Sequence, residues 1–548
     1  ASLVIESSFA ANIKEDKFEQ ILATVKAIGT HCYVFVENGK TVSDKAIENV
    51  QKTFDEKIYP TDTTYFGSEW KPGIDGDERI TLLLLDIRDG FDPQSNPGYV
   101  AGYFFAGDEF LQSQIPADVP VKSNEREMFY LDIHPSNPEE ENYMGVVAHE
   151  FQHMIHFAQD PQEFTWVNEG CSMMAMQFCG YRDSVLNHIA MFMKTPDNSM
   201  PSWSDEQTMA CYGEVYLWNY YLMHRYLGED EATRQKFFRE LVENKKQGGA
   251  SYDEALKPFK TDFTTAFQDF CVTNFINSPK MEQGQFAYDK SLGRLRLPAS
   301  TQIKAVPGKA QEKVFPWSGE AIKVDLTGAK TTVKVEFGGP NVKVTEKDTL
   351  KFTAFAVFSD SRDAQVPMLK KIETSVSPDK KLQVGAVEVS TSGKYDTLNV
   401  IVTLTCTTAI PDQAFKQVKD GIPYIVQVSD SGIMTASGNT RRIPIRPMID
   451  QYVPAAATLV TAEGAASEQA LTTLEGLTHD ITREVKGQLE AGSLSAVKEL
   501  IEAASDAQKR EALRPLAKKV ADQVSASKVQ SQSQNVELES MIKQLRDF

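Results

Sequence analysis

The spacing of apolar residues changes character three times along this chain of 548 residues, and one domain does not accommodate all four patterns. Residues 1–135 alternate between helical and strand-like spacing, and residues 136–282 keep an almost unbroken helical spacing. Strand-like alternation replaces it over 283–452, and helical spacing with almost no aromatic residues returns over 453–548. Because a domain commonly takes about 100 to 200 residues, we predict a multi-domain protein with boundaries at these changes.

The first of these segments predicts an α/β layer. Apolar residues at helical spacing predict helices over 12–28 and 42–58, the second with Ser43 or Asp44 as its cap. Short apolar and β-branched runs predict strands over 32–37, 80–86, 99–105 and 128–133. We predict a β-sandwich over 283–452 and a small bundle of long helices over 453–548.

Composition argues against several classes of protein. With 41% hydrophobic and 24% charged residues, the chain has enough apolar side chains to form hydrophobic cores, which argues against disorder. The 57 Lys and Arg against 76 Asp and Glu leave a net charge of −19, so we expect no nucleic-acid partner. No stretch approaches the ~18 apolar residues of a membrane-spanning helix, so we expect no transmembrane segment. The six cysteines form no CxxC pair, which argues against a thiolate zinc site.

One predicted helix carries a metal-binding pattern. Asn137 as N-cap, followed by Pro138 and three glutamates, predicts a helix that runs to about Gln159. It contains the HExxH pattern His149-Glu150-Phe151-Gln152-His153. Residues i and i+4 share a helix face, so both imidazoles can bind one metal, and Glu150 can reach a water on that metal. Imidazole nitrogen suits zinc, whose catalytic sites take three protein ligands, so a third ligand is required.

Glu169 is the candidate for that third ligand. It lies 16 positions beyond His153, in a second predicted helix that begins with Trp166-Val167-Asn168-Glu169-Gly170 after the turn signal Asp160-Pro161. This spacing lets the chain reverse and return a carboxylate to the metal. The alternative is chance, since an accidental HExxH arises in roughly one such sequence in a hundred. Two histidines and one glutamate nevertheless form a natural catalytic zinc site.

The motifs HEFQH and WVNEG resemble the HExxH and NEA or NEG pair of the gluzincin metallopeptidases, the clan of thermolysin and aminopeptidase N. The wider stretch, from IDGD at 74–77 through GYVAGYF at 98–104, is similar to the hyicolysin-like family of bacterial metallopeptidases. The resemblance covers residues 70–230, less than a third of the chain. It implies an α+β zincin-like catalytic domain, with a mixed sheet, an active-site helix and a helical subdomain, and a secreted or cell-envelope protein.

By this resemblance His149, His153 and Glu169 correspond to the zinc ligands, and Glu150 corresponds to the catalytic base. Two departures from the clan are visible. The spacing between the HExxH and the ligand glutamate is shorter than in thermolysin, and Met173 stands where thermolysin-like enzymes place an Asp that orients a ligand histidine. The groups that orient the ligands must therefore come from elsewhere.

Gluzincins commonly stabilise the oxyanion with a Tyr or His from a later helix, and two tyrosines are candidates here. Tyr212 and Tyr216 lie in a helix whose spacing predicts a start near Ser204 and an end at Gly228. We prefer Tyr212 as the second catalytic residue. The alternative is that both are ordinary core or rim aromatics.

Two further sites are suggested by local patterns. A glycine-spaced strand is a candidate edge that binds an extended peptide, and its residues are Gly98, Tyr99, Val100 and Ala101. Acidic residues around the strand at 80–86 are candidate calcium ligands, although ordinary turns are the favoured interpretation; they are Asp75, Asp77, Asp86, Asp89 and Asp92.

These observations together predict a zinc-dependent metalloendopeptidase that hydrolyses internal peptide bonds of protein or peptide substrates. The aminopeptidase motif GxMEN, which holds a free substrate amine, is absent, and this disfavours an exopeptidase. A second hypothesis is an inactive surface adhesin or binding protein with a peptidase-like domain, but the intact Glu150 argues against it. The β-sandwich and the C-terminal helices are candidates for contact with a surface or a protein partner.

Overall fold

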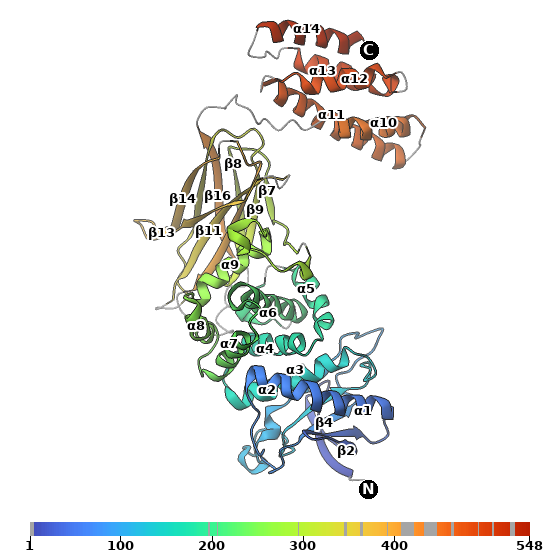
Figure 1. Ribbon diagram of the computed structural model, residues 1–548, viewed down its shortest axis with the longest axis vertical. Coiled ribbons are helices and arrows are strands. Elements are labelled where there is room, and N and C mark those ends of the chain that lie inside the picture. The colour runs from blue at the N-terminus through green and yellow to red at the C-terminus, as the bar shows by residue number, and fades with distance from the viewer. Residues whose placement is uncertain are drawn as a thin grey trace.

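The structure of the chain, a computed structural model, is multi-domain, and its parts follow one another along the long axis (Figure 1). A six-stranded sheet with its helices lies at the N-terminal end, followed by a group of helices, a β-rich region and a C-terminal helical bundle. The mixed α and β content agrees with the sequence prediction at this level. The residues described are 5–195, 198–204, 206–293, 295–344, 348–361, 365–391, 393–406, 421–431, 446–461, 465–490, 493–506, 509–525 and 532–547.

The N-terminal sheet has the strand order β1-β2-β3-β4-β6-β5, in which β3, β4 and β6 are parallel and the other pairs are antiparallel. All six residues of β4 are buried, because apolar clusters cover both faces of the sheet. The edge position of β5 leaves one side of that strand without a partner strand in the sheet. The strands are β1 (Ile5–Asn12), β2 (Lys17–Ile28), β3 (Cys32–Glu37), β4 (Ile80–Leu85), β5 (Gly102–Phe104) and β6 (Met128–Asp132).

The helix predicted over 12–28 is wrong, because most of this segment is the strand β2. Leu22 and Ile28, which contribute to the helical spacing, are 54% and 64% exposed in the strand, whereas Ile21 and Ala23 are buried. Pairing with β1 on one side and β3 on the other overrides the local spacing. The next helix is confirmed, since Ser43 accepts a hydrogen bond from the Ala46 N–H and caps α1.

The helices of the N-terminal half form two groups: α1 and α2 lie against the sheet, and α4 to α9 form a larger group beyond it. Helices α1 and α2 precede β4, joined by a π-helical turn, and α3 crosses from the sheet to the larger group (Figure 1). The helices are α1 (Asp44–Thr53), α2 (Tyr59–Phe66), α3 (Tyr143–Gln159), α4 (Thr165–Phe178), α5 (Leu186–Phe192), α6 (Thr208–Leu222), α7 (Glu231–Glu243), α8 (Gly249–Leu256) and α9 (Phe263–Ile276). The π-helical turns are Phe54–Ile58 and Met223–Leu227.

Two predicted helix starts differ from the structure. Helix α3 begins at Tyr143 rather than beside Asn137, whose side chain instead accepts a hydrogen bond from the Glu139 N–H at 3.1 Å within a turn. Helix α6 begins at Thr208, four residues after Ser204. The predicted ends hold: α3 stops at Gln159, and the π-helical turn after α6 is capped by Gly228 at a φ of 66°.

The β-rich region consists of two five-stranded sheets, ordered β13-β14-β10-β16-β8 and β12-β11-β15-β9-β7. Phe337 of β10 and Phe352 of β11 lie with their ring centroids 5.2 Å apart, so the two sheets pack face to face. The strands are β7 (Thr301–Ile303), β8 (Gly308–Val314), β9 (Ser318–Asp325), β10 (Thr332–Pro340), β11 (Leu350–Ser359), β12 (Met368–Glu373), β13 (Ser375–Val376), β14 (Leu382–Ser390), β15 (Thr397–Cys406) and β16 (Ile422–Ser431). Trp317 joins this region to α9, since its ring lies 4.7 Å from that of Phe263.

The C-terminal helices pack around an apolar cluster of their own. Ala, Leu, Val and Ile dominate this cluster, as expected for a segment with few aromatic residues. Within the described residues, no helix combines the length and the apolar character needed to cross a membrane. The helices are α10 (Arg446–Thr461), α11 (Ala465–Glu490), α12 (Ser495–Ser505), α13 (Arg510–Val524) and α14 (Gln532–Asp547).

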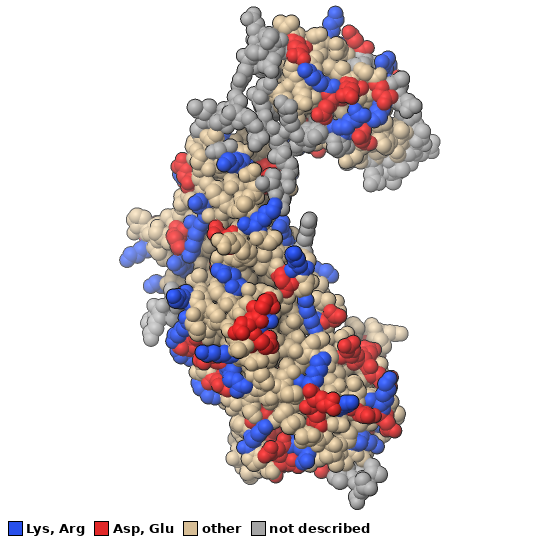
Figure 2. Space-filling model, in the orientation of Figure 1, with Lys and Arg blue, Asp and Glu red and all other residues tan. Residues whose placement is uncertain are grey.

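Charged side chains of both signs are interspersed over the face of the molecule that Figure 2 shows. On this face, acidic groups alternate with lysines and arginines over the sheet, the helices and the β-rich region. The net charge of −19 is therefore not gathered into one patch there.

Candidate metal centre and catalytic site

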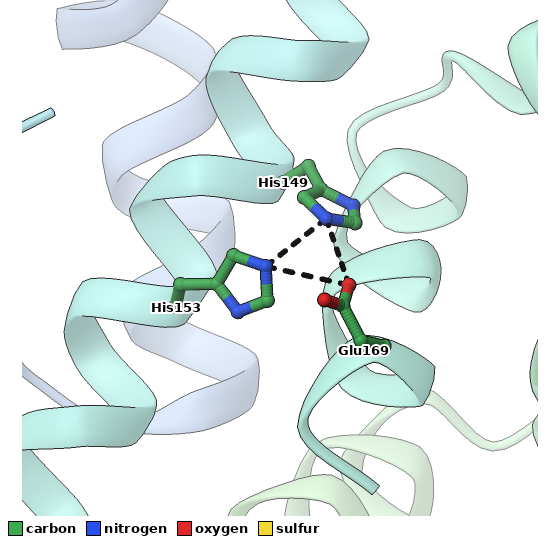
Figure 3. Close-up of side chains that lie close together, drawn as sticks. All are labelled: His149, His153 and Glu169. Carbon is green, nitrogen blue, oxygen red and sulfur yellow. Dashed lines mark hydrogen bonds and ion pairs between the residues drawn. The ribbon is translucent and has the colours of Figure 1, made fainter. Parts of the chain in front are cut away.

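Helices α3 and α4 bring together the residues that the sequence singled out. The two helices are joined by the short turn at 160–164 and pack against each other. His149 and His153 project from α3, and Glu169 projects from α4 toward both imidazoles (Figure 3). The spacing of four along α3 places the two histidines on one face, and the helix pair supplies the carboxylate.

The ligand atoms of these three residues converge on one point. His149 Nε2 lies 3.1 Å from His153 Nε2 and 3.1 Å from Glu169 Oε2, and the distance from His153 Nε2 to Glu169 Oε2 is 3.4 Å. Among the described residues, no donor makes a well-directed hydrogen bond to the buried Glu169 Oε2, so a cation at this point would satisfy it. The group can therefore hold a metal ion.

The electrostatics of the group favour a positive charge beside Glu169. Burial opposes the charged form of His153, but the neighbouring carboxylate outweighs this and raises the pKa of His153 to about 9. In the same way, His153 and His149 outweigh burial and hold the pKa of Glu169 well below its usual range. The carboxylate of Glu169 is thus kept ionised beside the two imidazoles.

A second layer of side chains orients His153, and the sequence analysis did not find it. The His153 Nδ1–H donates to Asn168 Oδ1 at 2.5 Å, and the hydroxyl oxygen of Ser172 lies 3.1 Å from the same nitrogen. Ser172 in turn donates to Gln152 Oε1 at 2.5 Å, and Gln152 Nε2 lies 3.3 Å from Nδ1 of the buried His156. A hydrogen bond at Nδ1 leaves Nε2 free to bind a metal, which is how such partners commonly act. The only sequence signal was the position of Asn168 next to Glu169.

Glu150 is buried between α3 and the edge strand β5. Burial raises the pKa of its carboxyl group, and the neighbouring His149 and His153 act against this rise. The close approach depends on Gly102, because a Cβ atom there would lie 2.8 Å from Val146 Cγ1 and 3.1 Å from Glu150 Cγ. The sheet edge, the HExxH helix and the candidate base thus meet at one place.

Tyr212 lies beside the histidines, whereas Tyr216 does not. The ring of Tyr212 is 5.9 Å from that of His149, and burial together with Glu169 raises the pKa of Tyr212 well above its usual range, so the hydroxyl keeps its proton. The hydroxyl of Tyr216 instead donates to Gln177 at 2.8 Å. His188 of α5, which no sequence pattern selected, has its ring centroid 5.4 Å from that of Tyr212, and burial lowers the pKa of His188 to about 4.

The strand predicted over 99–105 is shorter than expected, and this moves the candidate substrate edge. Of the predicted residues Gly98, Tyr99, Val100 and Ala101, none lies in β5, which begins at Gly102. The Val100 N–H donates to Asp89 Oδ2 at 2.7 Å, and the Ala101 carbonyl accepts from the Asp132 N–H at 2.9 Å. Because β5 is the edge strand of the sheet, Gly102–Phe104 is the segment that can pair with another strand.

The acidic residues considered for calcium all have partners among the described residues. Asp86 forms an ion pair with Lys40 at 2.5 Å. Each of the other four accepts a hydrogen bond from the backbone N–H two residues onward, and these are Asp75, Asp77, Asp89 and Asp92. In the part of the chain that the structure describes, His149, His153 and Glu169 form the one convergent group of three or more His, Cys, Asp or Glu ligands. A calcium site stays a prediction, without support from these loops.

The sequence matches no protein-family model, and it matches no curated protein. Assignment of a function to this chain therefore depends on the chemistry of the site.

Proposed function

We propose that this protein is a zinc-dependent metalloendopeptidase of gluzincin type, with a zincin-like catalytic domain formed by the N-terminal sheet and helices. The observation that carries the proposal is the convergence of His149, His153 and Glu169 beside a buried Glu150 on the same helix. A general base adjacent to a two-histidine, one-carboxylate centre is the arrangement that hydrolytic zinc sites use.

The ligand spacing supports zinc in particular. Zinc–ligand bonds of about 2.0 to 2.1 Å in tetrahedral geometry separate the ligand atoms by about 3.3 Å. The three distances between the ligand atoms, 3.1, 3.1 and 3.4 Å, lie close to this value. Two imidazole nitrogens and one carboxylate also leave a fourth tetrahedral position for water or substrate.

When bound, zinc supplies a Lewis acid that polarises the scissile carbonyl and makes a coordinated water more acidic. Glu150 accepts the proton of the attacking water at its carboxylate and returns it to the leaving amine, and its raised pKa suits it to both transfers. Tyr212, which keeps its proton, donates its O–H to the developing oxyanion. Asn168 holds the His153 ring in the orientation that this requires.

The edge strand β5 supports cleavage within an extended peptide. A substrate that adds to Gly102–Phe104 would lie along α3, with its scissile bond beside Glu150. Such pairing uses the substrate backbone and requires no free terminus. Secretion or residence in the cell envelope stays a prediction, and fractionation of the source cells tests it.

The test of this function combines zinc content with hydrolysis of a peptide. We expect one zinc per chain, together with hydrolysis of an internally quenched peptide blocked at both ends, for the wild type. Glu150→Gln keeps the size of the side chain and removes the base, so zinc should remain while hydrolysis falls by at least 100-fold, a typical general-base contribution being about 10² to 10⁴.

The matched control is Glu214→Gln, which makes the same replacement at a buried glutamate that binds Asn198 on another side of α6. Burial raises the pKa of Glu214 as it raises that of Glu150, so both variants replace a buried carboxyl group by an amide. Zinc without hydrolysis in the wild type would favour the binding-protein hypothesis. Equal losses of hydrolysis in Glu150→Gln and Glu214→Gln would contradict the role of Glu150 as general base.

A further inference from the structure

A cluster of four aromatic side chains, Trp70, Phe104, Phe110 and Phe157, lies at the C-terminal end of α3. Phe157 is the centre of this aromatic patch, with its ring 5.7 Å from Trp70, 5.9 Å from Phe104 and 6.1 Å from Phe110. Three separate segments thus supply rings to one place: the loop after α2, the edge strand β5 with the turn that follows it, and α3.

The patch is open to solvent although its rings are large and apolar. Trp70 is 38% exposed and Phe110 is 39% exposed, and Leu111 extends the surface with a similar exposure of 41%. A Trp indole that serves only as core filling would be buried. Here the indole N–H donates to the Ala158 carbonyl at 3.2 Å, which fixes the ring at the end of α3. A fixed, exposed group of rings is suited to contact with an apolar ligand.

The patch is continuous with the candidate catalytic site along two elements. On α3, Phe157 lies one turn beyond His153 on the face that carries both histidines, a rise of about 6 Å. On β5, Gly102 lies beside Glu150, and Phe104, two residues later, lies beside Phe157. The strand β5 therefore advances from the candidate base toward the patch, in the direction of the C-terminal end of α3.

We propose that this aromatic patch receives an aromatic or long aliphatic side chain of the substrate, on the amino-terminal side of the scissile bond. This inference rests on the proposed peptidase function. A peptide that adds to β5 in the antiparallel sense runs opposite to β5, so its amino-terminal part meets the patch. At about 3.3 Å per extended residue, a distance of about 6 Å places the preferred side chain roughly two residues from the scissile bond.

The test measures kcat/KM on internally quenched peptides blocked at both ends, which share one scissile bond. Phe, Ala or Asp is placed at each of the three positions on either side of that bond. The proteins are wild type, Trp70→Ala, Phe110→Ala, Trp70→Phe and the control Leu22→Ala, which removes an exposed apolar side chain from β2. Zinc content and far-UV circular dichroism show that each variant is folded and loaded.

We expect the wild type to favour Phe over Ala by at least about tenfold at a position on the amino-terminal side. Trp70→Ala and Phe110→Ala should each reduce this preference by several-fold, through a loss of kcat/KM on the Phe peptide. Trp70→Phe retains an apolar ring and should retain most of the preference, and Leu22→Ala should retain all of it.

Three results would overturn the inference: no preference in the wild type, a preference confined to the carboxyl-terminal side, or a preference that survives both alanine substitutions. Loss of binding to lipid vesicles in Trp70→Ala, with unchanged peptide preference, would assign the patch to a membrane surface and would equally overturn it. Failure of the wild type to cleave any blocked peptide while zinc is bound contradicts the proposed function itself, which separates the two failures.

Discussion

Replacement of Asn168 by Ala tests whether the hydrogen bond to His153 tunes the metal centre. The 2.5 Å contact joins the Nδ1–H of His153 to an acceptor oxygen in a largely buried site. A buried donor that loses its acceptor costs about 1 to 3 kcal/mol, which corresponds to roughly 5- to 150-fold in affinity. The hydroxyl oxygen of Ser172, 3.1 Å from the same nitrogen, remains as a substitute acceptor. We therefore expect zinc affinity to fall about tenfold in Asn168→Ala and about 100-fold in the double variant with Ser172→Ala.

The assay is competition for zinc against a chromophoric chelator, with thermal unfolding measured on the same samples. Asn198→Ala is the matched control, because Asn198 is a buried asparagine that binds Glu214 rather than a ligand histidine. It should lower the melting temperature and leave zinc affinity unchanged. Wild-type zinc affinity in a folded Asn168→Ala variant would refute the reasoning, as would an equal loss of affinity in the control.

Three further predictions concern catalysis, packing and pH. Tyr212→Phe removes the hydroxyl beside the histidines, so kcat should fall about 100-fold with zinc content unchanged, and an unaltered kcat would show that another group binds the oxyanion. Gly102→Val introduces a Cβ atom against Val146 and Glu150, so peptide hydrolysis should fall while zinc stays bound, as elemental analysis of the purified variant would show. Asp62 is fully buried, and burial raises the pKa of its carboxyl group, so its contribution to stability is full below the unfolded-state pKa of about 3.9 and declines as pH rises. Asp62→Asn should therefore melt at a higher temperature than wild type at pH 7, with a difference that shrinks toward pH 4, and a constant difference would contradict this sign.

The parts of the fold that sequence patterns predicted share a strong local signal. The strand β3 spans the predicted residues, and β4 differs from its prediction by one residue. Short apolar runs between turn residues usually form buried strands, so the local pattern was sufficient for both. Alternation over 283–452 likewise predicted β-structure, and the two sheets occupy much of this range, although α10 already begins at Arg446. The prediction for 12–28 was wrong because the apolar residues of β2 happen to fit helical spacing, and only pairing with β1 and β3 shows which of them face the core.

In the candidate site, too, sequence patterns predicted the local relations between side chains and missed those that depend on packing. Helix geometry alone relates His149 to His153, and a reversal of the chain over 16 residues is a short-range event, so both were accessible to sequence reasoning. The Asn168 contact with His153 was missed, because a neighbour in sequence reaches the ring only once α4 packs on α3. The edge strand β5 begins at Gly102, four residues after the predicted Gly98, and the Val100 N–H donates to Asp89 outside the strand.

The sequence by itself determined the candidate metal-binding group: two imidazoles and a carboxylate at distances along the chain that one helix and one turn bring together. Those relations depend on helical periodicity, which is a property of the local backbone. Only the tertiary structure decided which strand edge, which tyrosine and which aromatic side chains surround that group. These come from segments up to about 140 residues apart, from Trp70 to Tyr212, and burial and packing rather than periodicity bring such segments together.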